Sequence, residues 1–344
     1  MRVSRLSILI PAEGGAEPLE RTLASVLQNR PEACEVIVVT HGEYDDPYEL
    51  AGEVRFLAAP LTAGSIQRIQ HGLRHCRGPV VHVLRAGVEA TDHWTDVPLA
   101  HFEEANVAAV APLIVDASDQ RRVVSAGLDY RTGGRLIVRA AGESVDCTPS
   151  AAQHIVGPAL SAAFYRLEAL QRCGDDFDTR LGIQFAGADW ALAMRRRGYV
   201  SLFEPSSRLV GEADPRDVTA TARAAWQAER LFWRHAATIG WTRSLAAHGG
   251  VVLAECARHW KSPQVAVSRL AGMLVGCGWA ISHRKPAGRK VAAQKPAVTD
   301  ATVPNAAVTS ATGTIEATSR VIHRTDAGEA TTPAPRRDSF ERAH

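Results

Sequence analysis

The sequence lacks several features that mark particular classes of protein. Its six cysteines include no Cys-x-x-Cys pair, which argues against a zinc site or a disulfide framework and favours reduced thiols. Its charged residues sum to only +2, which is too small a net charge to indicate a nucleic-acid-binding surface. No apolar stretch reaches the roughly 20 residues of a membrane-spanning helix. The nearest approach, residues 265–282, is interrupted by Arg269.

The first apolar run is too short for a signal peptide. Residues 6–10 are apolar apart from one serine, but Pro11 and Glu13 follow almost at once. A secretory signal needs a longer apolar segment before its cleavage site. We therefore expect this run to be the first strand of a cytoplasmic protein that does not bind nucleic acid.

The first third of the chain alternates between strand and helix patterns. β-branched and apolar runs predict strands, and apolar residues at helical spacing predict helices between them. The expected strands are residues 6–10, 35–39, 54–58 and 80–84, and the expected helical stripes are residues 19–27 and 66–76. This alternation predicts an α/β fold with a doubly wound, mainly parallel sheet that is covered by helices on both faces.

Such sheets bind ligands beyond the carboxyl ends of their strands, near the point where the strand order reverses. We therefore expect a binding edge that contains residues 11–13, 40–43 and 85–87.

The rest of the chain changes character twice. Its patterns predict strands at residues 107–115, 154–165 and 199–204, a hairpin around 132–134, and helices at 167–173, 187–197 and across 217–282. Beyond Lys285 the sequence is rich in Ala, Thr, Val and Pro and poor in large apolar residues, which predicts a disordered tail. The expected domains are an α/β domain over residues 1–211, a helical extension over 212–283 and the tail over 284–344.

The order of these segments resembles the family 2 glycosyltransferases of the GT-A fold. Residues 7–11 (SILIP), 23–28 (LASVLQ) and 35–39 (EVIVV) are similar to the family's opening strand, helix and second strand. Residues 64–84 are similar to its nucleotide-side helix and the strand that follows. Residues 177–199 are similar to its acceptor-side block. The resemblance implies transfer of a sugar from a nucleotide sugar to a polysaccharide or lipid-linked acceptor.

The chain departs from this family on the donor side. The family's Asp-x-Asp, which holds Mg²⁺ or Mn²⁺ and the donor diphosphate, aligns with Arg85 and Gly87, and neither offers a carboxylate oxygen. The acid that recognises the nucleotide base is replaced by Thr40 or His41. The resemblance thus implies a metal ion, but the residues that would bind it are missing from this chain.

The acceptor side departs as well. The family's Glu-Asp pair aligns with Ala186 and Gly187, and a histidine that often follows the last strand aligns with Gly211. Only Asp189 remains as a general base, and its alternative role is structural, because it is expected one turn inside a helix whose first turn favours acids. These replacements indicate a catalytically impaired chain.

Two groups of residues could compensate for the missing carboxylates. Arg85 could neutralise a diphosphate through its guanidinium, or serve as a surface charge. Glu89, Asp92 and His93 could form a displaced metal site, or remain solvated loop charges. We assign Asp189 to catalysis, no residue to a metal, and the following residues to substrate binding: Pro11, Glu13, Thr40, His41, Arg85 and Gly87.

The helical region over residues 212–283 can be interpreted in two ways. Trp226, Arg230, Trp233 and Arg234 lie close together in the sequence, which favours an amphipathic surface that rests on the inner membrane leaflet. A plain helical appendage packed on the sheet explains the same residues. The function likewise has an alternative, a non-catalytic domain that binds a nucleotide, a glycan or a protein partner within a polysaccharide-assembly system.

Overall fold

The computed structural model describes residues 5–12, 15–42, 44, 46–174, 177–212, 221–239, 241–258, 261 and 263–282. Met1–Pro286 form one compact unit and Ala287–His344 another. The second unit, and with it the tail predicted over 284–344, lies outside the described residues.

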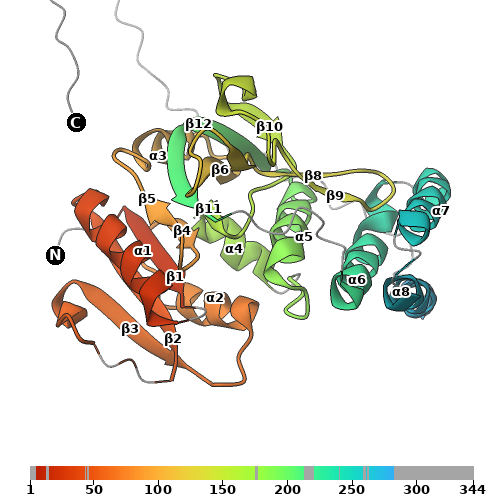
Figure 1. Cartoon of the computed structure of the whole chain (residues 1–344), viewed down its shortest axis with the longest axis horizontal. Helices are drawn as coiled ribbons and strands as arrows, with labels where there is room; N and C mark the ends of the chain where they lie inside the picture. Colours follow the sequence, from red (N-terminus) through yellow and green to blue (C-terminus); the bar gives the residue numbers. More distant parts are fainter. Residues whose placement is uncertain are drawn as a thin grey trace, which may run out of the picture. The chain divides into compact units, whose positions relative to one another are not determined.

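A mixed, mainly parallel β-sheet forms the centre of the first unit (Figure 1). Its main strands are β1 (Leu6–Pro11), β2 (Cys34–His41), β3 (Val54–Ala59), β4 (Val80–Leu84), β6 (Val107–Asp116), β10 (Gln153–Ile155), β11 (Ala162–Arg166) and β12 (Val200–Gly211). They are ordered β10-β12-β6-β11-β4-β1-β2-β3. β4, β1, β2 and β3 are parallel, as are β12 and β6, whereas β11 runs antiparallel to both of its neighbours.

Short strands extend this sheet and form a separate hairpin. β5 (Glu89–Ala90) pairs with β12, and β7 (Val123–Ser125) pairs with β6. β8 (Leu128–Tyr130) and β9 (Leu136–Val138) form the hairpin that was predicted around residues 132–134.

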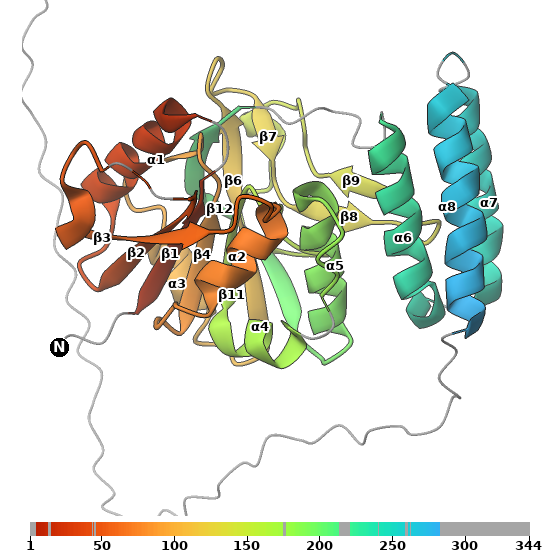
Figure 2. The ribbon, with the colours of Figure 1, turned by 90° about the horizontal axis from the view of Figure 1, so that it is seen from below.

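Helices cover both faces of the sheet. They are α1 (Ala16–Asn29), α2 (Ser65–Leu73), α3 (Asp96–His101), α4 (Leu167–Cys173) and α5 (Ile183–Arg195). Because successive strand residues face opposite sides, Ile8 of β1 packs in the core with Leu23 of α1, whereas Leu9 packs with Ile69 of α2. α1 and α3 thus cover one face, and α2, α4 and α5 cover the other (Figure 2).

The strand predicted over residues 154–165 is wrong as a single element, because it is divided into β10 and β11. Gly157 lies in the break, where an added Cβ would come within 2.3 Å of the Ala191 Cβ in α5. Pro158 follows and has no N–H to donate to a strand ladder. The close approach of α5 therefore interrupts the strand.

Two other boundaries differ from the prediction. α5 begins at Ile183, four residues earlier than residue 187, and β12 continues beyond Pro205 to Gly211. β12 passes the proline through an irregularity in its pairing with β6 between Glu204 and Arg208. Such a bulge tolerates the missing N–H.

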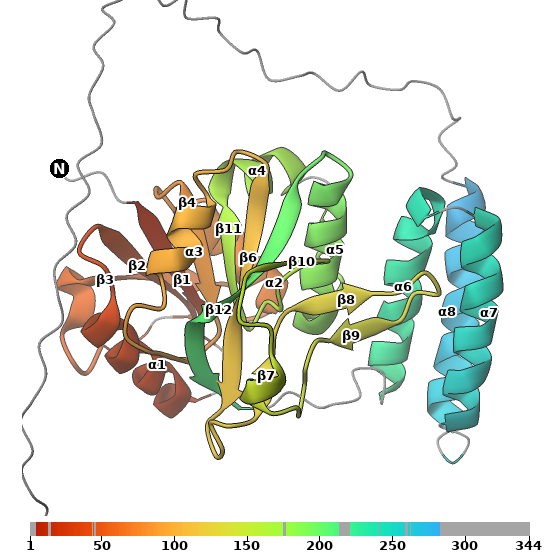
Figure 3. The same cartoon turned by 90° about the horizontal axis from the view of Figure 1, so that it is seen from above.

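Three further helices lie in the region that was predicted to be helical: α6 (Ala222–Ile239), α7 (Trp241–Arg258) and α8 (Pro263–Ser282). α6 lies between α5 and the α7–α8 pair (Figures 2 and 3). Among the described residues, no helix is long and apolar enough to cross a membrane.

The extension contacts the β8–β9 hairpin through a buried cluster. His248 of α7 places Nδ1 2.9 Å from the Gly133 carbonyl oxygen and Nε2 2.9 Å from Glu229 Oε2 of α6. Phe232 stacks on the His248 ring with 3.6 Å between centroids. Gly134 has a φ of +88°, and an added Cβ would lie 2.7 Å from the Phe232 ring. A glycine turn therefore allows the hairpin to rest against α6.

His82 of β4 is a fully buried histidine in the sheet core. Its ring stacks on Phe164 with 3.8 Å between centroids, and Nδ1 lies 3.3 Å from the Ala163 carbonyl oxygen. Burial lowers the pKa of His82 to about 3. In the unfolded chain the same ring takes up a proton near pH 6.5. The free energy of unfolding therefore falls as the pH decreases from about 6.5 towards 3.

We expect the His82→Phe variant to lose part of this acid sensitivity. Between pH 6 and 4 the free energy of unfolding of the wild type should fall more steeply than that of the variant, by up to about 1.4 kcal/mol per pH unit. Urea unfolding at several pH values measures the two slopes. A matched control is His154→Gln, because His154 is exposed in β10 and should leave the slope unchanged. Equal slopes for His82→Phe and the wild type would contradict the prediction.

Candidate functional site

The carboxyl ends of β1, β2 and β4 lie at one edge of the sheet. Pro11 of β1 is in register with Val39 of β2, and Leu9 is in register with Val83 of β4. The residues that follow these strands therefore occupy neighbouring positions, as expected. Glu13, which was also predicted at this edge, lies outside the described residues.

The side chains at the end of β2 form hydrogen bonds to other groups of the protein. Thr40 is 5% exposed, and its hydroxyl donates to the Gly42 carbonyl oxygen at 2.7 Å. His41 is exposed, and its Nε2 contacts the Arg68 guanidinium of α2. A guanidinium can only donate, so His41 Nε2 is the acceptor. Arg68 also donates to the Ala63 carbonyl oxygen at 2.9 Å, which fixes this charge beside the edge.

Gly87 acts through its backbone. Its φ is +94°, a left-handed conformation that favours glycine. Its N–H donates to the Pro18 carbonyl oxygen at 3.1 Å and to Thr22 Oγ1 at 2.9 Å, so the loop after β4 is tied to α1. The structure therefore gives Gly87 a role in the turn.

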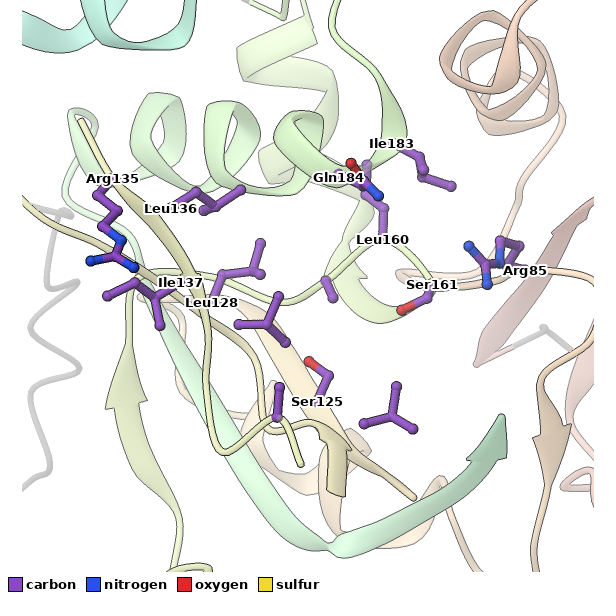
Figure 4. A pocket seen from close by; sticks show the side chains of 14 residues that line it. Arg85, Ser125, Leu128, Arg135, Leu136, Ile137, Leu160, Ser161, Ile183 and Gln184 are labelled. Carbon is purple, nitrogen blue, oxygen red and sulfur yellow. The ribbon is translucent and has the colours of Figure 1, made fainter. Parts of the chain in front are cut away.

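Arg85 lines a pocket of about 230 Å³ (Figure 4). Five segments meet there: the loop after β4, β7, the β8–β9 hairpin, the residues before β11 and the first turn of α5. Their polar side chains are Arg85, Ser125, Arg135, Ser161 and Gln184. The two guanidiniums lie at different ends of the pocket in Figure 4. The pocket combines positive charge with hydroxyl and amide groups, which suits an anionic, hydroxyl-rich ligand.

Sequence reasoning identified Arg85 but missed the other polar residues of this pocket. Arg135 directly follows the glycines of the predicted hairpin, which was the one local signal available. Ser161 lay within a segment predicted as a continuous strand. Its backbone carbonyl accepts a hydrogen bond from the Arg85 N–H at 2.9 Å, an interaction across 76 residues of sequence that no local pattern reveals.

The described residues do not fit a divalent metal at this edge. They contain no group of three or more His, Cys, Asp or Glu side chains that could hold one. In the displaced site considered above, Glu89 lies 3.7 Å from Arg21, and exposed His93 places Nδ1 2.9 Å from Asp96. Glu89 is thus engaged in a surface ion pair, and His93 in a hydrogen bond with its neighbour in the loop. The described lining of the Arg85 pocket also contains no carboxylate or imidazole.

Asp189 is completely buried, in the second turn of α5. Because α5 begins at Ile183, Asp189 lies one turn inside the helix. Its Oδ2 accepts from the Asp178 N–H at 2.9 Å. Its Oδ1 accepts from Arg234 Nε at 3.0 Å and from His235 Nε2 at 2.8 Å. Two consecutive residues of α6 therefore bind one carboxylate of α5.

The protonation state of His235 follows from its partners. Arg196 Nη1 lies 2.8 Å from His235 Nδ1, and because a guanidinium only donates, Nδ1 must accept. His235 is then a neutral imidazole that donates from Nε2 to Asp189. Burial lowers the pKa of His235, in agreement with the neutral form.

The Asp189 carboxylate is ionised within this network. Burial alone would raise its pKa, but the hydrogen bond from His235 and the Arg234 charge outweigh burial and hold the pKa below its ordinary value. Both oxygens are engaged by protein donors. These contacts give Asp189 a structural function, and its catalytic function stays a prediction.

The fold is that of the GT-A glycosyltransferases. A structure of GalNAc-T7 with UDP, GalNAc and Mn²⁺ has a TM-score of 0.52 and 16% identity, over 67% of this chain and 48% of that one. The present chain thus spans about half the length of that relative. The mannosyltransferase PcManGT from Pyrobaculum calidifontis, with GDP-Man and Mn²⁺, has a TM-score of 0.45 and 16% identity, over 82% of this chain and 88% of that one.

The family itself is identified by the sequence. Residues 7–174 match the family described as Glycosyl transferase family 2, and the chain therefore carries a family 2 glycosyltransferase domain. No curated protein matches the sequence.

The Asp189 network generates a stability prediction. We expect Asp189→Asn to lower the free energy of unfolding by about 3 kcal/mol, because an amide lacks the negative charge that Arg234 and His235 bind and turns an NH2 group towards one of the buried donors around it. Urea unfolding measures this loss. Asp116→Asn is a matched control, because the Asp116 carboxylate is partly exposed and accepts from Ser118 in its own loop, so its replacement should cost far less. An Asp189→Asn variant as stable as the wild type would contradict a structural function.

Proposed function

We propose that the Arg85 pocket binds a nucleotide sugar and that the chain transfers the sugar without a divalent metal at the Arg85 loop. The position of Arg85 carries this proposal, because its guanidinium lines the pocket at the carboxyl edge of β4. The GalNAc-T7 relative binds UDP together with Mn²⁺. In the present chain a permanent positive charge replaces the carboxylates that would hold a metal.

The chemistry of transfer explains why this charge matters. The bond between the anomeric carbon and the diphosphate breaks, and the nucleoside diphosphate leaves with the bonding electrons. Positive charge beside the departing diphosphate stabilises the transition state. A guanidinium binds phosphate oxygens through two parallel N–H groups, so Arg85 has suitable chemistry for this function. Ser125, Ser161 and Gln184 offer hydrogen bonds to sugar hydroxyls.

The side chains that line the Arg85 pocket also indicate which kind of acceptor the chain would use. A hydroxyl acceptor loses a proton as it attacks, and a general base normally removes it. The described lining contains no carboxylate or imidazole for this task. A phosphate oxygen is already anionic and needs no base. We therefore favour a lipid-linked phosphate over a polysaccharide hydroxyl as the acceptor, which would place the enzyme at the cytoplasmic surface of the inner membrane.

The same replacements favour a second candidate function. A domain that binds a nucleotide, a glycan or a protein partner without turnover would need neither metal ligands nor a base. This non-catalytic scaffold would keep the pocket but show no sugar transfer to any acceptor.

We expect UDP, GDP, dTDP or CMP, or one of their sugars, to raise the melting temperature of the full chain equally with and without Mn²⁺. Arg85→Ala should remove this shift, and Arg85→Lys should restore part of it, because an ammonium keeps the charge without the bidentate geometry. Arg172→Ala is a matched control, because Arg172 pairs with Glu168 on the surface of α4.

Two results would contradict the proposal. A shift that requires Mn²⁺ would mean that a metal, not Arg85, neutralises the diphosphate. No shift with any nucleotide, in a chain that unfolds cooperatively, would favour a scaffold that binds a glycan or a protein.

A further inference from the structure

A second pocket lies where α6 and α8 meet the segment before α5. Its volume is about 190 Å³. Three arginines and two tryptophans line it: Arg180, Arg230, Arg234, Trp226 and Trp233. Arg180 is only three residues from Ile183, which lines the Arg85 pocket, so the two pockets flank the beginning of α5. The family resemblance gave this pocket no role.

The charges of this pocket are arranged asymmetrically. Arg230 and Arg234 donate their Nε–H groups to Asp178 and Asp189, whose side chains are 6% and 0% exposed. The guanidiniums themselves keep 28% and 20% exposure and line the pocket. The carboxylates are therefore withdrawn into the protein, and the arginines form the accessible surface.

Arg180 adds a third positive charge to the pocket. It is exposed, and within the described part of the chain its side chain makes no ion pair. Its backbone N–H donates to Asp178 Oδ1 at 3.1 Å, which positions Arg180 beside the ion pair between Arg230 and Asp178. The terminal amino groups of Arg230 likewise make no hydrogen bond among the described residues. Guanidinium groups that line one pocket offer N–H donors and positive charge to the oxygens of a phosphate.

An apolar ridge of exposed side chains lies on the two outer helices, one of which borders the charged pocket. Val275 of α8 lines the pocket and is 57% exposed. Leu270 and Leu274 of the same helix are 51% and 76% exposed, and Leu253 of α7 is 73% exposed. α7 and α8 form the outer edge of the described structure (Figures 2 and 3). Exposed apolar side chains that gather on one pair of helices mark a binding surface.

We propose that this pocket binds the phosphate of a lipid and that the lipid's apolar chain lies along α8. The three arginines supply the charge complementarity, and the ridge distinguishes a lipid phosphate from free phosphate. Tryptophan suits the boundary between the two, because its ring is apolar and its N–H is polar. The assignment of this lipid as the sugar acceptor rests on the proposed function, whereas its binding does not.

The test is binding of farnesyl phosphate to the full chain, measured by calorimetry without any nucleotide sugar. Farnesyl phosphate should bind at least about tenfold more tightly than either inorganic phosphate or farnesol, because only it engages both the arginines and the ridge. Arg180→Gln should weaken its binding by about tenfold. Arg172→Gln is the matched control on exposed surface and should not change it.

Two further variants locate the ligand. Leu274→Ser should weaken binding of farnesyl phosphate but not of inorganic phosphate. Arg85→Ala should leave binding of farnesyl phosphate intact, which assigns it to the second pocket. Melting curves of each variant confirm that it is folded.

Three results would overturn the proposal. They are equal binding of farnesol and farnesyl phosphate, equal binding of inorganic phosphate and farnesyl phosphate, and unchanged binding by Arg180→Gln. A chain that binds farnesyl phosphate but no nucleotide would support this inference and contradict the proposed function.

Discussion

The burial of Asp189 is the constraint on which the arrangement of α5 and α6 depends. An ionised carboxylate removed from water is stable only where donors and positive charge replace its hydration. Arg234 and His235 supply them, and because these residues are consecutive, α6 cannot rotate about its axis without losing one of them. The rotation of α6 then decides which of its side chains face α8. Trp226 and Arg230 line the second pocket for this reason.

The sheet edge shows how one fold can keep the arrangement of its loops while its electrostatics change. The parallel register of β1, β2 and β4 brings their loops together whatever side chains the loops carry. In this chain Arg85 follows β4, and Arg68 of α2 bonds to His41 at the end of β2, so the proposed function has this edge attract anions directly. An edge with carboxylates would do so only through a bound cation. Gly87 meanwhile holds the loop against α1 through its backbone.

Much of the fold could be predicted because its signals are local. The strands β1 to β4 and the helix α4 follow from apolar periodicity, β-branched residues and the glycine that ends α4. Errors arose where a distant element decided the outcome, as when Ala191 of α5 interrupts the predicted strand at Gly157. The same limit applies to the sites. Arg85 could be located from its strand end, but the partners of Asp189 lie 45 and 46 residues away in the sequence.

The contact between His248 and Gly133 bears on how the chain can be divided. The β8–β9 hairpin is a wall of the Arg85 pocket, and it rests on α6 and α7 through Gly133, Gly134 and Phe232. The chain should therefore not be truncated near residue 211, where the sheet ends and the helical region follows. A fragment that ended there would expose the inner faces of the hairpin and of α5 to water. The helices therefore support the hairpin, and with it one wall of the Arg85 pocket.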